Sequence, residues 1–220
     1  MFFHFHPYKP FLHEDTQRII VGTLPPPRFC EKNFKEKDVN FCYGSQDNLL
    51  WQALNVIFNL NLPFDHSQEA VTLRKDFLRQ KKIGVCDIVE SCKREKVDAS
   101  DIGMSDVKLR DILGYLEKYK NIDTIIFTGG LCKNSPEYFL RQILKIQNIT
   151  YTNISESIPK VHEFLYKNRQ IRTISLTSPS NAANRSIGAN SYYKEQKKRN
   201  PSYTTFDFRV EQYAKIFKQF

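Results

Sequence analysis

The strongest constraint on the fold is a set of four short apolar runs, separated by stretches in which apolar residues recur with helical spacing. The apolar runs cover residues 18–22, 83–89, 122–128 and 171–176. The main helical stretches cover residues 48–59, 70–81, 106–119, 135–146 and 207–220. Strands that alternate with helices favour a mostly parallel sheet with helices on both faces. We therefore expect an α/β fold, a three-layer α/β/α sandwich around a central, mostly parallel four-stranded sheet.

The length of the chain suits one such sandwich. With 220 residues, of which 40% are hydrophobic, the sequence can bury one core but is short for two. A single domain over residues 1–220 is the expectation. Residues 150–165 fit neither a helix nor a strand clearly and stay unassigned.

Polar and turn-forming residues follow each expected strand. They are Thr23-Leu24-Pro25, Asp87, Thr128-Gly129-Gly130 and Thr177-Ser178-Pro179. Ligands of open α/β sheets bind beyond the carboxyl ends of the strands, so these segments should line one cleft. The long connection over residues 23–47 adds to this expectation, because long ordered loops in compact domains are usually functional.

The net charge of the chain favours a polyanionic partner. Lys and Arg total 33 against 24 acidic residues, a formal net charge of +9. Such a balance promotes nucleic-acid binding through counterion release, although solubility alone is a simpler explanation. Residues 185–220 hold eight basic side chains against three acidic ones, directly after the Ser178 loop. We predict DNA contacts by four of the basic residues: Arg185, Lys197, Lys198 and Arg199.

Several classes of protein are disfavoured by what the sequence lacks. The five cysteines form no C-x-x-C pair, which predicts reduced thiols, no iron–sulfur cluster and a cytoplasmic location. His4 and His6 have no Cys/His cluster around them, so neither a metal site nor a cofactor is expected. No run approaches the roughly 20 apolar residues of a membrane span. The expectation is a monomer without metal, cofactor or membrane contact.

Six segments in a fixed order resemble one enzyme family. They are Gly22-Thr23-Leu24-Pro25, Tyr43-Gly44-Ser45-Gln46-Asp47-Asn48-Leu49-Leu50-Trp51, Cys86-Asp87-Ile88-Val89, Cys92-Lys93-Arg94, Asp98-Ala99-Ser100-Asp101-Ile102 and Ser178-Pro179-Ser180-Asn181-Ala182-Ala183-Asn184. Together these motifs, which span residues 18–186, resemble the uracil-DNA glycosylase superfamily, and most closely its hypoxanthine/uracil branch related to the mismatch-specific enzymes. The resemblance implies a DNA glycosylase of base-excision repair. Such an enzyme flips uracil or hypoxanthine out of single- or double-stranded DNA and hydrolyses its N-glycosidic bond without a cofactor.

The sequence departs from other branches of this superfamily at two points. The first loop presents Thr23-Leu24-Pro25 in place of the Asp or Asn that activates water elsewhere, and the last loop lacks the His of the His-Pro-Ser form. In the branch that the chain resembles most, the catalytic Asn belongs to the second motif and corresponds to Asn48. Thr23 is the second catalytic candidate. These departures keep a noncatalytic nucleic-acid-binding relative as an alternative, and a hydrolase of free nucleosides or nucleotides is a further one.

The chemistry of glycosidic hydrolysis suits these residue types. The reaction develops oxocarbenium character on the sugar and negative charge on the base, so the enzyme must place water and stabilise the leaving group. Asn48 can orient water through its neutral amide, or it can simply cap the helix that follows. Asp87 can accept a hydrogen bond from a ring N–H of the base, or pair with loop N–H groups. Phe41 or Tyr43 can stack on the flipped base, or belong to the core.

The Ser178 loop completes the expected site. Ser178 is assigned to base binding, while Ser180, Asn181, Asn184 and Arg185 are placed against phosphate or in the minor groove. The alternative is a Ser/Pro turn that starts a helix.

Overall fold

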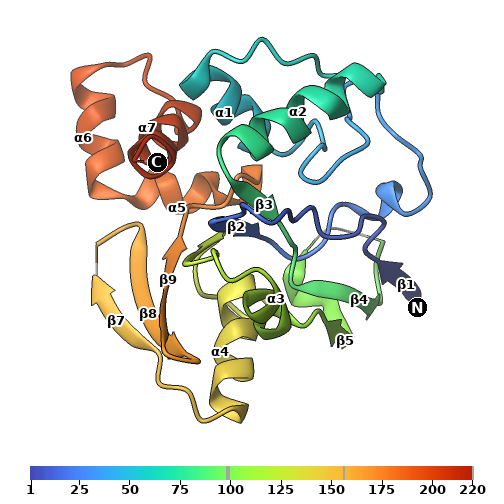
Figure 1. Cartoon of the computed structure of the whole chain (residues 1–220). Coiled ribbons are helices and arrows are strands. Elements are labelled where there is room, and N and C mark those ends of the chain that lie inside the picture. The colour runs from blue at the N-terminus through green and yellow to red at the C-terminus, as the bar shows by residue number, and fades with distance from the viewer. Residues whose placement is uncertain (98–99, 156, 220) are drawn as a thin grey trace.

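A six-stranded sheet forms the centre of the computed structural model, which describes residues 1–97, 100–155 and 157–219 (Figure 1). In spatial order the strands are β3 (Ile83–Val85), β2 (Arg18–Val21), β6 (Thr124–Phe127), β9 (Arg169–Ser175), β8 (Lys160–Tyr166) and β7 (Thr152–Ser155). The first four are parallel, whereas β8 and β7 continue the sheet as an antiparallel hairpin. The mostly parallel α/β sheet is confirmed, but its expected size of four strands is wrong. The unassigned residues 150–165 supply most of the two extra strands.

Helices pack on both faces of this sheet, which makes three layers. One face is covered by α1 (Leu50–Phe58), α2 (Gln68–Gln80) and α7 (Thr205–Phe217), the other by α3 (Ile112–Lys118) and α4 (Pro136–Ile146) (Figure 1). Successive side chains of a strand point to opposite faces. Accordingly Ile20 belongs to the core under α1, α2 and α7, whereas Ile19 and Val21 belong to the core under α3 and α4.

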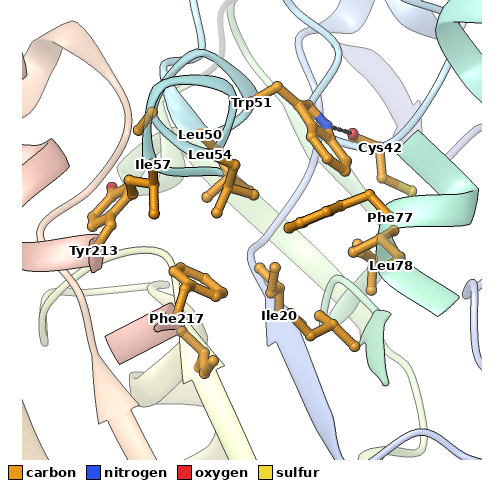
Figure 2. Close-up of a cluster of buried hydrophobic side chains, with 14 of the residues drawn as sticks. Ile20, Cys42, Leu50, Trp51, Leu54, Ile57, Phe77, Leu78, Tyr213 and Phe217 are labelled. Atoms are coloured by element: carbon orange, nitrogen blue, oxygen red, sulfur yellow. Dashed lines mark hydrogen bonds between the residues drawn. The ribbon is translucent and has the colours of Figure 1, made fainter. Parts of the chain in front are cut away.

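The core under α1 is built around an indole ring. Trp51 is 2% exposed and donates its Nε1–H to the carbonyl of Cys42 at 2.8 Å, so its single polar atom is satisfied inside the core (Figure 2). Tyr213 and Phe217 of α7 belong to the same core as α1. Burying such a side chain stabilises the fold by about 1.5–3 kcal/mol. The start of α1 is thereby fixed against the sheet.

A second, three-stranded antiparallel sheet lies beside the first and was not expected. It consists of β1 (Phe2–Phe5), β4 (Val89–Arg94) and β5 (Met104–Leu109), with β4 in the middle. The apolar run over residues 83–89 is therefore not one strand. It leaves the main sheet after Val85, and Val89 starts β4 in the other sheet.

The helix expected from Asp106 is wrong at its start. Asp106 lies in β5, and α3 begins only at Ile112, where the side chain of Asp111 accepts a hydrogen bond from the Gly114 N–H at 2.8 Å. Met104 is buried while Ser105 and Asp106 are exposed, so this stretch pairs with β4 before the helical pattern begins.

The remaining elements are short. They are the 3₁₀ turns η1 (Pro27–Phe29), η2 (Asp101–Gly103) and η3 (Asn181–Ala183), and the helices α5 (Asn184–Ala189) and α6 (Ser191–Arg199). The turn η3 and helix α5 directly follow the Ser178 loop. No helix in the described part of the chain is both long enough and apolar enough to cross a membrane.

Candidate active site

A cavity of about 430 Å³ opens at the carboxyl edge of the parallel strands. Its walls come from the segments that the strand ends were expected to bring together. The lining residues are Gly22, Thr23, Leu24, Pro25, Pro26, Pro27, Arg28, Tyr43, Gly44, Ser45, Asp47, Asn48, Asp87, Val97, Asp101, Thr128, Pro136, Ser178, Pro179 and Ser180. The expectation of one shared cleft is confirmed, while the role of each residue stays a prediction.

Asp87 is a buried carboxylate held by three donors. Its Oδ1 accepts hydrogen bonds from the Tyr43 hydroxyl at 2.6 Å and from the Gly22 N–H at 2.9 Å, and its Oδ2 lies 2.8 Å from Nε2 of His6. Burial alone would raise the pKa of Asp87, but the hydrogen bond and electrostatic interaction with His6, together with the hydrogen bonds from Tyr43 and Gly22, outweigh it, so the pKa lies below its usual value. The pairing with a loop N–H is therefore real, and Asp87 also lines the cavity as an anion.

Gly22 allows this close arrangement. A Cβ at this position would lie 2.6 Å from the Tyr43 hydroxyl oxygen, 2.9 Å from Oδ1 of Asp87 and 2.9 Å from Oγ1 of Thr128. Only glycine lets the backbone N–H approach the carboxylate so closely. Burial and the negative charge of Asp87 raise the pKa of Tyr43 well above its ordinary value, so the phenol remains a proton donor.

Asn48 joins the start of α1 to the Ser178 loop. Its Oδ1 accepts a hydrogen bond from the Leu50 N–H at 3.0 Å, and its backbone forms an isolated antiparallel bridge with Ser180. The neighbouring Leu49 N–H donates to the carbonyl of Pro179 at 2.9 Å. This contact is a turn from Asn48 to the first residue of α1, whereas the N-cap position is Leu49 and has no side-chain capping hydrogen bond, so Asn48 supports the helix start without being its cap. The Nδ2 group remains a neutral donor on a residue that lines the cavity.

Thr23 contacts a second carboxyl group, that of Asp101. Its hydroxyl donates to Oδ1 of Asp101 at 2.7 Å, and both residues line the cavity. Burial raises the pKa of Asp101 to about 6. In the sequence Asp101 was only part of the acidic-Ser motif and had no assigned role. Asp98 and Ala99 of that motif lie outside the described residues.

Asp101→Asn is expected to remove part of the pH dependence of stability. The pKa of Asp101 is raised from 3.8 to about 6, so its contribution to stability is complete below pH 3.8 and is lost as the pH rises through about 6. Asn is neutral throughout and still offers an oxygen to Thr23. Thermal unfolding between about pH 4 and pH 8 should show a higher Tm for the variant above pH 6. The control is Asp76→Asn on the exposed surface of α2, and an unchanged Tm profile in Asp101→Asn would contradict the assignment.

The Ser178 loop is clamped from the C-terminal helix. Arg209 of α7, which is fully buried, donates from Nε to the Ser178 carbonyl at 2.9 Å and from a terminal nitrogen to the Ser180 carbonyl at 2.8 Å. Within the loop, the Ser180 hydroxyl accepts from the Ala182 N–H at 3.2 Å and thereby starts η3. The loop therefore forms a Ser/Pro turn that starts a helix, as the alternative interpretation had it, and the same loop lines the cavity. In the sequence Arg209 was counted only as one of several basic residues.

Phe41 does not line the cavity. It is 5% exposed and packs in the core, with ring centroids 5.8 Å from Phe11 and 6.2 Å from Trp51. The structure thus places Phe41 with the core, as its alternative interpretation had it, and leaves Tyr43 as the aromatic residue at the cavity.

Comparison with solved structures finds a protein of similar fold. The chain matches the solution NMR structure of a Methanosarcina acetivorans protein proposed to be a uracil DNA glycosylase, with a TM-score of 0.57 and 20% sequence identity, over 99% of this chain and 98% of that one. At this identity the match shows a shared fold. No protein-family model matches the sequence, and no curated protein matches it either.

The residues expected to contact DNA lie outside the cavity, except Ser180. Asn181 and Arg185 are exposed, and Asn184 begins α5. Lys197 donates to the carbonyls of Pro201 and Tyr203 at 2.6 and 2.8 Å. Arg199 is paired with Glu195 on the same helix, whereas Lys198 is exposed.

No group of three or more His, Cys, Asp or Glu side chains in the described ranges is arranged to hold a metal ion. The five cysteines are free thiols. From the sequence, His6 was expected to cap the core with the aromatic N-terminal segment rather than to bind metal, and its contact with Asp87 was not foreseen.

Proposed function

We propose that the protein is a DNA glycosylase that hydrolyses the N-glycosidic bond of a deaminated base, uracil or hypoxanthine, in DNA. The observation that carries the proposal is the meeting of Asp87, Asn48 and the Ser178 loop in one cavity at the carboxyl edge of the four parallel strands. A base must leave the duplex to be attacked, and a cavity of about 430 Å³ has room for it. The fold shared with the Methanosarcina acetivorans protein supports the same proposal.

The proposal assigns roles to the predicted site residues that line the cavity. Asp87, held as an anion, accepts a hydrogen bond from the ring N–H of the base, and Tyr43 lies beside the base ring. Asn48 orients the attacking water, with Thr23 as the second polar group on that side. Ser178 contacts the base and Ser180 the adjoining phosphate. The reaction then uses water as the nucleophile and needs no metal or cofactor.

Further parts of the proposal come from the sequence. The enzyme is monofunctional, acts as a monomer in the cytoplasm and binds damaged single- or double-stranded DNA as part of base-excision repair. A hydrolase of free nucleosides or nucleotides is the alternative, because a cavity that accepts a flipped nucleotide of DNA can also accept a free nucleotide. The two functions differ only in the substrate.

A released-base assay tests the proposed function. Uracil-containing DNA, hypoxanthine-containing DNA, unmodified DNA, deoxyuridine and deoxyinosine are incubated with the protein, and free base is quantified. Release from one or both damaged DNAs alone supports a DNA glycosylase. Release from the free nucleosides alone identifies a nucleoside hydrolase. DNA binding without release from any substrate identifies a noncatalytic relative.

The affinity for DNA is expected to fall steeply with salt, and Arg185 and Lys198 should account for part of the slope. Both side chains are exposed, whereas Lys197 and Arg199 are engaged with neighbouring groups of the protein. Each lost phosphate contact reduces the slope of log K against log salt concentration by about 0.9. The double variant Arg185→Gln/Lys198→Gln should therefore bind with a flatter slope, measured by fluorescence anisotropy.

The control for this experiment is Lys145→Gln. Lys145 lies in the last turn of α4, whereas Pro136 at the other end of that helix lines the cavity. An equal change of slope in the control, or an unchanged slope in the double variant, would place the DNA on another surface.

A further inference from the structure

His6 reaches the cavity carboxylate from the N-terminal segment. It directly follows β1, and its backbone N–H donates to the Glu90 carbonyl of β4 at 2.8 Å. Its side chain is 1% exposed, and Nε2 lies 2.8 Å from Oδ2 of Asp87. The three-stranded sheet thus holds the imidazole of His6 against Asp87, a residue that lines the cavity at the edge of the six-stranded sheet.

The hydrogen bonds define which nitrogen of His6 carries the proton. The backbone N–H of Tyr8 donates to Nδ1 of His6 at 3.2 Å. A backbone N–H can only donate, so Nδ1 is the acceptor and bears no proton. Nε2 therefore carries the hydrogen and donates it to Asp87. In this pattern the Nε2–H of His6 points at the carboxylate, while Nδ1 is turned to the backbone of its own segment.

The same hydrogen bonds define which lone pairs of Asp87 remain for a ligand. Oδ1 accepts from two donors, the Tyr43 hydroxyl and the Gly22 N–H, and Oδ2 accepts from one, His6. A carboxylate oxygen has about two lone-pair sites, so Oδ2 is the oxygen with capacity for one more donor. Tyr43 and Gly22 both donate to Oδ1, and His6 is the donor that contacts Oδ2. The orientation of Oδ2 therefore depends on His6.

We propose that His6 is a positioning residue of the active site, which as an Nε2–H donor fixes Oδ2 of Asp87 for the contact with the substrate. The inference rests on the proposed function for its catalytic part. His6 does not touch the substrate in this account, and it acts through Asp87.

Several other groups influence the same carboxylate. Tyr43 and Gly22 donate to it directly, and electrostatic interactions link it to three further groups. These are the thiols of Cys42 and Cys86 and the carboxyl group of Asp101. The guanidinium of Arg110 interacts with both thiols and donates to the Tyr8 carbonyl at 2.7 Å.

Two substitutions of His6 separate positioning from packing. His6→Leu removes the donor, whereas His6→Gln places an amide N–H near the position of Nε2. Single-turnover base release should fall on the order of 10²-fold in the Leu variant, the scale of a mispositioned group, while the Gln variant keeps most of the rate. The Kd for DNA should stay unchanged in both, since phosphate contacts dominate it.

His4→Leu is the matched control. His4 lies two residues earlier on β1, is fully buried, and accepts a hydrogen bond from Arg94 at 2.8 Å rather than contacting Asp87. Loss of stability from removing a buried histidine of the N-terminal segment should therefore appear in both Leu variants. Carboxyl ¹³C NMR of Asp87 should shift its titration to higher pH in His6→Leu only, because a hydrogen bond that favours the anion is lost.

The outcomes distinguish this inference from the proposed function. A Gln variant as slow as the Leu variant at equal folded fraction overturns the inference, and so does a carboxyl titration that His6→Leu leaves unmoved. If the unsubstituted protein releases no base from any DNA, the proposed function is overturned. In that case a titration that responds to His6 alone still supports the positioning of Asp87 by His6, because the NMR measurement needs no substrate.

Discussion

Asp87→Asn is expected to lower the single-turnover rate of base release on the order of 10²-fold or more, the scale of a lost electrostatic group in an active site. The amide has the shape of the carboxylate but lacks its charge, and one of its two polar atoms is a donor. Three donors converge on Asp87, from His6, Tyr43 and Gly22. Whichever way the amide turns, at least one of them faces an N–H group and loses its acceptor.

The same substitution should also destabilise the fold. A buried donor without an acceptor costs about 1–3 kcal/mol. Rate and thermal unfolding are therefore measured together, and the rate is referred to the folded fraction. Asp76→Asn on the surface of α2 controls for the loss of one negative charge. A folded Asp87→Asn protein that releases base at the original rate would reduce Asp87 to a purely structural carboxylate.

Asn48→Ala is expected to have an effect of similar size on base release, on the order of 10²-fold or more, if its amide orients the water. Because Oδ1 of Asn48 also accepts from the Leu50 N–H, the Ala variant should lose about 1 kcal/mol of stability as well. Asn48→Asp keeps an oxygen for that N–H but replaces the amide donor with a second anion near Asp87. We expect this variant to be stable and slow.

The comparison of the two Asn48 variants separates catalysis from support of the helix start. Base release and Tm are measured on both proteins. A loss of stability in Asn48→Ala without a rate defect in the remaining folded protein would leave Asn48 as a support of the helix start. The water-positioning group would then have to be Thr23 or Asp87.

Strands β2, β3 and β6 could be predicted because they are buried on both faces, and the neighbouring β9 because its second half is buried. Residues of β2 and β6 are apolar on both sides, so the sequence shows a continuous apolar run and not an alternation. The strands outside this set are different. In β7 most side chains are exposed and in β5 half of them are, and β1 pairs with β4 across more than eighty residues of sequence. Short, half-exposed strands with distant partners leave little local signal.

The cavity shows the same division between local and distant information. Asn48, Asp87 and the Ser178 loop could be placed together because each follows the end of a strand or starts a helix. The supports of the cavity could not, since His6 and Arg209 contact partners far away in sequence. Phe41 illustrates the reverse case: an aromatic residue in a loop has no local feature that tells core from cavity. Burial of its ring is decided by Phe11 and Trp51.

The clamp that Arg209 makes on the Ser178 loop has a consequence for biosynthesis. A ribosome delivers the chain from the N-terminus, and domains fold as their segments emerge. His6 is available from the start, but the carbonyls of Ser178 and Ser180 meet their buried guanidinium only after α7 has been made. Contacts of such long range also slow folding. A nascent chain that ends before α7 therefore lacks the clamp, and the Ser178 loop should take its final position at the cavity only after this helix has docked.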